Sequence, residues 1–180
     1  MSGHNKWSQI KQKKGAEDAK RSKLFSMLVR QITIEAKRAG GNREDPGLKG
    51  AVTRAKEANM PNDNIERAIS KATSAGAESF ENVIYEAFGP GGVAIVIEGI
   101  TDNKNRTTPE IKHLLSKQGL ALGGQGSAMW AFEKIAGELK PKSTISLAEN
   151  DKKKLTEIIE NLEEHDDIKN VVTNAGQNQK

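Results

Sequence analysis

The sequence predicts an α+β protein in which a helical first half is followed by a sheet with helices on one face. In the first half, apolar residues recur at intervals of three and four, which is typical of amphipathic helices. In the second half the apolar period changes to two, with β-branched runs that favour strands. A small-residue segment at 73–79 separates the halves, so we expect two domains, residues 1–76 and 77–180.

The first half has the pattern of a small three-helix bundle preceded by a loose N-terminal arm. Apolar residues spaced three or four apart cover 24–36, and Gly40 and Gly41 stop that helix. A second helix is predicted from about 46 to 58. A third follows Pro61, with Asn62 as its expected cap.

The second half begins with the pattern of a β-hairpin. Two β-branched runs, 83–88 and 93–100, flank a Gly-Pro-Gly-Gly turn. A capping box at 107–110 then predicts the start of a helix that Gly119 ends. The remaining expected elements, in chain order, are a strand at 128–132, a strand at 143–147, a helix at 149–163 and a strand at 168–173.

Composition limits the function classes. Apolar residues make up 35% of the 180 residues and aromatic residues 4%, which predicts a modest aliphatic core. The absence of cysteine excludes disulfides, thiolate zinc sites and thiol nucleophiles, and it favours a cytoplasmic location. The longest aliphatic run, 93–97, is far shorter than the roughly 20 residues that span a bilayer, so no membrane partner is expected.

The charge distribution indicates a nucleic-acid partner for the first half. The residues up to Gly76 contain 16 Lys and Arg against 8 Asp and Glu, whereas the remainder contains 12 against 16. Cations can hold phosphates while Trp7 stacks on a base, although a solvated basic face with Trp7 docked on the bundle is the competing interpretation. The candidate nucleic-acid-binding residues are His4, Lys6, Trp7, Lys11, Lys13, Lys14, Lys20, Arg21, Lys23 and Arg30.

Helical periodicity places several of these cations on one face of the first predicted helix, where they form an incomplete basic stripe. At 100° per residue, the cations of the first helix gather opposite its apolar residues, but Met27 and Ile34 interrupt the basic side. The stripe consists of Lys20, Lys23, Arg30, Lys37 and Arg38.

Other polar groupings give weaker signals. Asn105 and Arg106 lie between a predicted strand end and a helix start, where they form either a capped turn or a secondary phosphate contact. The glycine-rich segments 89–92 and 123–126 read as turns, because neither has the Lys-Ser/Thr of a phosphate-binding loop. His165 stands among acidic residues in an order that matches no known ligand spacing. We therefore expect no catalytic residue, no metal and no cofactor.

Several long motifs resemble those of the YebC/PmpR family. They are residues 2–7 (SGHNKW), 13–21 (KKGAEDAKR), 58–61 (ANMP), 65–69 (IERAI), 85–93 (YEAFGPGGV) and 101–107 (TDNKNRT), with a further likeness over 141–174. The resemblance implies the fold of an N-terminal three-helix domain and a ferredoxin-like α/β lobe. Family members usually carry a further inserted lobe, whereas only residues 134–140 fill that place here. The chain thus resembles a short-form member.

The resemblance also implies an intracellular, non-enzymatic function in gene expression. Some members are described as DNA-binding transcriptional regulators. Others, including a mitochondrial translational activator, are similar to ribosome-associated factors that relieve stalling at difficult sequences such as proline runs. Both activities would use the basic first half. The sequence therefore leaves two kinds of partner open, either DNA or ribosomal RNA and tRNA. It leaves the oligomeric state open as well.

Overall fold

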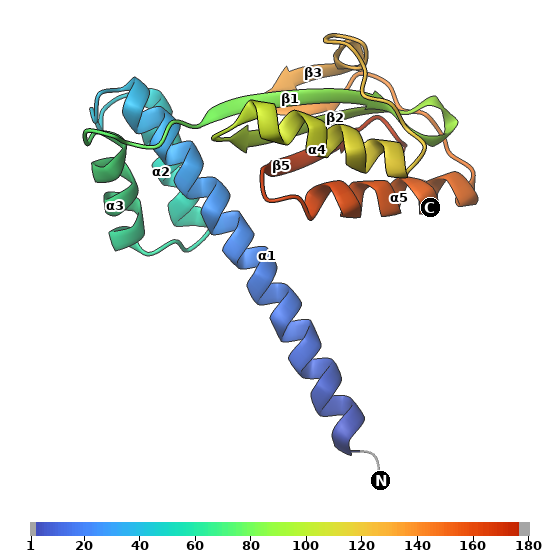
Figure 1. Ribbon diagram of the computed structural model, residues 1–180, viewed down its shortest axis with the longest axis horizontal. Helices are drawn as coiled ribbons and strands as arrows, with labels where there is room; N and C mark the ends of the chain where they lie inside the picture. Colours follow the sequence, from blue (N-terminus) through green and yellow to red (C-terminus); the bar gives the residue numbers. More distant parts are fainter. Residues whose placement is uncertain (1–2, 177–180) are drawn as a thin grey trace. The chain divides into compact units, whose positions relative to one another are not determined.

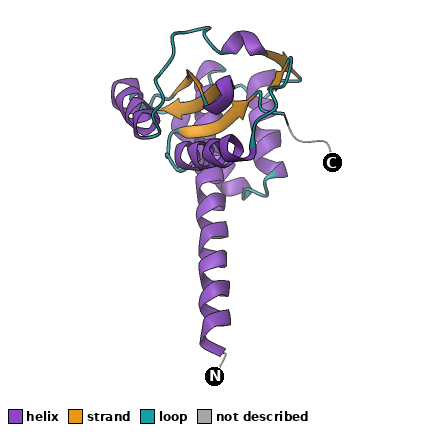
Figure 2. Cartoon of the chain, turned by 90° about the vertical axis from the view of Figure 1, so that its right-hand side faces the viewer, coloured by secondary structure: helices purple, strands orange, loops and turns teal. Residues whose placement is uncertain are grey.

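A computed structural model describes the backbone of residues 3–176 and the side chains of residues 15–176. The chain forms two compact units, residues 1–80 and 81–180, called here the N-terminal and the C-terminal unit. The N-terminal unit is helical and the C-terminal unit combines antiparallel sheets with helices, which confirms the α+β class (Figure 1, Figure 2).

Three helices make up the N-terminal unit: α1 (Gly3–Arg38), α2 (Pro46–Glu57) and α3 (Asn62–Ala72). Both α2 and α3 pack against the C-terminal half of α1, where Ile32 and Ala36 are fully buried (Figure 1). The start of α2 follows from its sequence, because the Asp45 side chain accepts hydrogen bonds from the amides of Gly47 and Leu48.

Two expectations for the N-terminal unit are wrong. The loose arm is instead part of α1, which is helical from Gly3 onward. This stretch contains no proline and only one interior glycine, Gly15, so a helix nucleated in the packed half can propagate through it. Asn62 is not a cap. Pro61 holds that position in extended geometry, and its carbonyl accepts from the amides of Asn64 and Ile65.

A three-stranded antiparallel sheet of order β1-β2-β5 forms the centre of the C-terminal unit, with a separate β3-β4 hairpin beside it. The elements are β1 (Glu81–Phe88), β2 (Ala94–Thr101), α4 (Lys104–Lys117), the short 3-10 helix η2 (Met129–Ala131), β3 (Phe132–Ile135), β4 (Glu138–Pro141), α5 (Glu149–Glu163) and β5 (Ile168–Thr173).

Both faces of the sheet are covered. On one face, Ile95 and Ile97 of β2 pack against α4 and α5, which lie side by side in Figure 1. On the opposite face, Ala94 and Val96 pack against η2 and Phe132 of β3. Successive strand residues point to opposite faces, so β2 is buried on both sides, which explains its uninterrupted apolar sequence.

Most elements of the C-terminal unit lie where the sequence predicts them. The β1-β2 hairpin, α5 at Glu149–Glu163 and β5 at Ile168–Thr173 are confirmed. Helix α4 starts earlier than the capping box at 107–110 suggests, because Asn103 caps it by accepting from the Arg106 amide.

Two expected strands are wrong in part or in full. The segment 128–132 is mostly η2 and joins β3 only at Phe132. The segment 143–147 forms no strand, only a bridge from Ile145 to Ala175, and the second strand of this region is β4 instead. In both places tertiary hydrogen bonds outweigh the local β-propensity.

Candidate nucleic-acid interface

The N-terminal half of α1 extends beyond the other two helices of its unit (Figure 1). Every residue from 15 to 22 is exposed, and contacts with the helical core begin only at Phe25. A helix of 36 residues is about 54 Å long, of which the short α2 and α3 can cover only a part. Packing within the unit therefore leaves residues 15–22 of α1 accessible to a partner.

The cations of α1 divide into exposed and anchored ones. Lys20 and Lys37 are exposed, and within residues 15–176 neither forms an ion pair. Arg21 is exposed but lies over the ring of Phe25, 5.2 Å from its centroid. Arg30 is partly buried and lies 5.5 Å from the ring centroid of Phe80, and Lys23 is partly buried as well. Among residues 15–38, Lys20 and Lys37 are thus the cations of this helix most available to phosphate.

Arg38, although part of the basic stripe, serves the fold of the unit. Its guanidinium donates to Glu35 over 3.0 Å and pairs with Asp45, the cap of α2. The amide of Leu48 and the Arg38 guanidinium together lower the pKa of Asp45. Asp45 is therefore held as a carboxylate that fastens α2 to the end of α1, and Arg38 is occupied by that contact.

The remaining predicted contacts of the N-terminal unit have side chains outside the described residues. Their backbone is helical, so Lys6 and Lys13 precede Lys20 at seven-residue intervals, close to two helical turns each. The residues concerned are His4, Lys6, Trp7, Lys11, Lys13 and Lys14.

The secondary candidate, Asn105 and Arg106, lies in the first turns of α4. Asn105 is exposed. Arg106 is held by carboxylates: Nη2 lies 2.6 Å from the Asp167 Oδ2 and 3.0 Å from the Asp102 Oδ1, and Nε lies 3.8 Å from Glu110. These ion pairs raise the pKa of Arg106, with Asp167 as the main cause. A phosphate at this site would have to compete with them.

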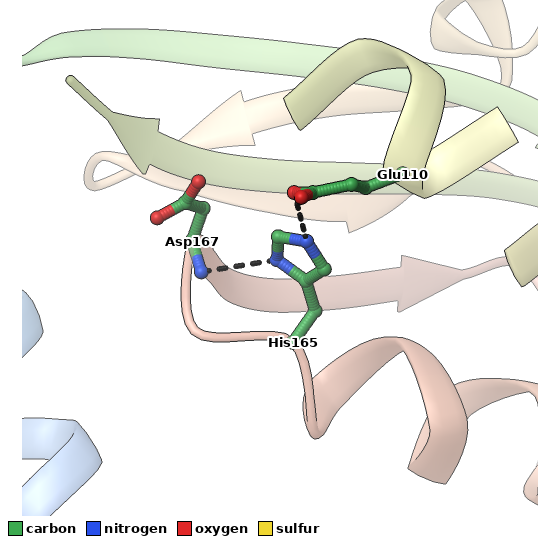
Figure 3. A group of neighbouring side chains, drawn as sticks. All are labelled: Glu110, His165 and Asp167. Atoms are coloured by element: carbon green, nitrogen blue, oxygen red, sulfur yellow. Dashed lines mark hydrogen bonds and ion pairs between the residues drawn. The ribbon is translucent and has the colours of Figure 1, made fainter. Parts of the chain in front are cut away.

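Glu110, His165 and Asp167 come together beside Arg106 (Figure 3), with potential ligand atoms within 4.8 Å of one another. Figure 3 shows that both ring nitrogens of His165 are engaged: Nδ1 accepts from the Asp167 amide over 3.1 Å, and Nε2 lies 3.0 Å from a Glu110 oxygen. The buried Asp167 carboxylate accepts from Arg106 and from the Thr107 hydroxyl, each over 2.6 Å. The group therefore fastens α4 to the start of β5.

Glu86 is a buried charge that the sequence pattern did not reveal. It is 4% exposed and lies on β1, on the sheet face opposite the helices. Its carboxylate accepts from the amides of Gly126, Ala128 and Met129 over 2.6, 2.6 and 2.8 Å. Burial raises the pKa of Glu86, but the three backbone donors outweigh burial and the net pKa is lowered. The anion therefore orders the 126–129 loop.

Trp130 is the second residue that sequence reasoning missed. It follows this loop in η2 and is 64% exposed. Its position inside an apolar segment predicts burial, so only the fold reveals its exposure. Among the described residues, no helix has the length and apolar character that a membrane span requires.

Comparisons with known proteins place the chain in a family. The family model named TACO1/YebC protein N-terminal domain matches residues 5–75 of the sequence. The family model named TACO1/YebC second and third domain matches residues 80–137. A protein of Aquifex aeolicus, solved as a conserved hypothetical protein, is 31% identical with a TM-score of 0.80. That match covers 91% of this chain and 93% of the other.

Relatives from several bacteria carry the name "Probable transcriptional regulatory protein". The one from Syntrophus aciditrophicus (strain SB) is 54% identical over 137 residues, which cover 74% of this chain and 55% of that protein. The chain thus spans about half the length of such relatives. The one from Pelotomaculum thermopropionicum is 36% identical, with 97% of this chain and 98% of that protein covered.

The second alignment runs over 238 positions, more than the 180 residues of this chain. Part of that relative therefore has no counterpart here, although both chains are matched over nearly their whole length. These matches show that the chain belongs to the TACO1/YebC family, as a short form.

Proposed function

We propose that this protein is a non-enzymatic nucleic-acid-binding regulator of gene expression, a YebC-type DNA-binding transcriptional regulatory protein that binds DNA through α1. The observation that carries the proposal is the exposed stretch 15–22 of α1, which contains Lys20, together with the exposed Lys37 at the C-terminal end of that helix; neither lysine is paired among the described residues. The names of its relatives support the same function.

The charges of the two units favour binding of DNA through the N-terminal unit. Residues 81–180 contain 12 Lys and Arg against 15 Asp and Glu, so the C-terminal unit attracts phosphates less than the basic N-terminal unit does. Cations repeated along a straight helix suit phosphate contacts, which position a protein on nucleic acid without reading its bases. We therefore expect weak sequence preference.

A non-enzymatic role is supported by the state of His165. Among residues 15–176 it is the histidine that contacts carboxylates, and its two ring nitrogens are held by Glu110 and by the Asp167 amide. With both nitrogens engaged, His165 serves as a contact between α4 and the start of β5.

The experiment is a salt titration of binding to labelled duplex DNA, followed by fluorescence anisotropy. If about five phosphates are neutralised, log affinity falls with log salt at a slope of about −4 to −5. The double variant Lys20→Gln, Lys37→Gln should reduce that slope by about 2. The matched control is Lys153→Gln with Lys154→Gln on α5, both exposed in the C-terminal unit, which should leave the slope unchanged. A slope near zero for the unmodified protein, or equal losses in both variants, would refute the proposal.

A competition between duplex DNA and purified ribosomes at physiological salt then tests the transcriptional part. Preferential retention on DNA supports a regulator that acts on transcription. Retention on ribosomes, lost in the α1 double variant, would replace it with the ribosome-associated translation function that the family resemblance also implies.

A further inference from the structure

We propose that Trp130 is a stacking platform for an unpaired nucleobase, and that Lys142 beside it holds the adjoining phosphate. This second contact lies on the C-terminal unit and rests on the proposed nucleic-acid function. Four features of the described residues support it: the fixed position of the indole, its exposure, the saturation of its one donor and the nearby Lys142.

The indole is held by an ordered chain of contacts. Its Nε1 donates to the Ser127 carbonyl over 2.7 Å. The loop that carries Ser127 is fixed in turn by the buried Glu86 carboxylate, which accepts from amides on both sides of that residue. Because the ring is already ordered, a stacking partner binds without the entropic cost of immobilising it.

The exposed ring offers an apolar surface that a partner can cover. Trp130 is 64% exposed, whereas its neighbours Ala131 and Phe132 are buried against the sheet at 1% and 4%. The single indole donor is already bonded within the loop, so the apolar ring faces are what the side chain offers to a partner. A flat aromatic ring without a free donor suits base stacking, which tolerates every base.

One lysine, Lys142, lies near Trp130 through its backbone although the unit as a whole is acidic. The Lys142 amide donates to the Ala131 carbonyl over 2.9 Å, which places Lys142 beside the residue that follows Trp130. Its side chain is exposed and forms no ion pair within residues 15–176. Lys140 of the same hairpin is exposed too, but its ammonium lies 3.9 Å from the Glu138 carboxylate and it stands opposite Glu133, so Lys142 is the cation proposed to hold the phosphate. An exposed aromatic ring with a cation nearby is the pattern of single-strand binding.

Trp130 can be observed by itself in the full-length protein. The chain has two tryptophans, so Trp7→Phe leaves Trp130 as the single indole, and all variants are compared in that background. The probes are a dye-labelled oligothymidylate and an abasic oligomer of equal length, which keeps the phosphates and lacks the bases. Binding is followed by dye anisotropy and by Trp130 fluorescence.

We expect the oligothymidylate to quench Trp130 fluorescence to saturation and the abasic oligomer to leave it unchanged. Trp130→Ala should weaken oligothymidylate binding by about 5- to 100-fold. Lys142→Gln should lower the salt slope of binding by about 0.7. The matched control is Ile135→Ala, an exposed apolar residue of the same hairpin, which should bind normally. Thermal melts confirm that each variant is folded.

The two proposals fail in different ways. If the oligomer binds by anisotropy while Trp130 fluorescence is unchanged and Trp130→Ala binds equally well, the platform is refuted and the function of α1 stands. Equal quenching by the abasic oligomer also refutes the platform, because phosphates alone would then account for it. If neither the oligomer nor duplex DNA binds the unmodified protein, with Trp7 in place, at low salt, the proposed function itself fails.

Discussion

Replacing Glu86 with Gln tests whether a buried anion holds the outer face of the C-terminal sheet together. One carboxylate oxygen accepts from the Gly126 amide and the other from the amides of Ala128 and Met129. A glutamine keeps the shape but sets its NH₂ group against one of these donors. One amide then loses its partner, at about 1–3 kcal/mol, and the other two bonds lose their charge assistance. We expect the free energy of unfolding to fall by about 3 kcal/mol.

The pH dependence of this loss has a definite sign. The folded-state pKa of Glu86 lies below its ordinary value of 4.5, so the carboxylate contributes stability that is fully present above pH 4.5. That stability is lost as the pH falls through the lowered pKa, because a protonated glutamic acid resembles glutamine. The difference between Glu86→Gln and the unmodified protein should therefore be constant near neutral pH and shrink in acid.

The assay is urea unfolding of the Trp7→Phe protein, in which Trp130 fluorescence reports on the C-terminal unit alone. The matched control is Glu81→Gln, an exposed glutamate on the same strand, which should change stability by less than about 0.5 kcal/mol. A loss below about 1 kcal/mol for Glu86→Gln, or one as large at pH 3 as at pH 7, would contradict this account.

Two further predictions concern the same unit. Ala136 has φ +51° and precedes Gly137 in the turn between β3 and β4, so Ala136→Asn should raise stability by about 0.5–1 kcal/mol, measured by thermal melting; a lower melting temperature would contradict the strain assigned to this alanine. Asp167→Asn should lower the free energy of unfolding by about 2–4 kcal/mol in urea, because the 2% exposed carboxylate pairs with Arg106 and Thr107, while DNA binding by α1 is unchanged. Lost DNA binding in a folded Asp167→Asn protein would show that the contact is not purely structural.

Much of the fold follows from local patterns. Helix α5 and strand β5 lie at the predicted residues, since their apolar periodicity and their flanking residues agree. Errors arose where local signals compete with tertiary contacts. The capping box at 107–110 looks like a helix start, yet Asn103 caps α4 four residues earlier in the chain. Residues 128–132 look like a strand, but the Glu86 carboxylate holds their start in another conformation.

For the candidate site, too, some features follow from the sequence and others only from the tertiary structure. The sequence by itself determined that the basic charge lies in the first half, because charge counts need no coordinates. Only the structure decided which cations are available: Arg38 is committed to Glu35 and Asp45, and Arg106 to three carboxylates, while Lys20 and Lys37 stay exposed. Ion pairs depend on which residues from distant parts of the chain meet.

For this protein, the sequence alone determined the α+β class, the two-part charge distribution and the resemblance to its family, because each is carried by residues that are neighbours along the chain. Tertiary structure alone decided that Glu86 is a buried anion and that Trp130 is exposed. The physical reason is that burial is a property of the packed molecule. A glutamate within a strand and a tryptophan within an apolar segment acquire their environments only when the 126–129 loop closes over β1.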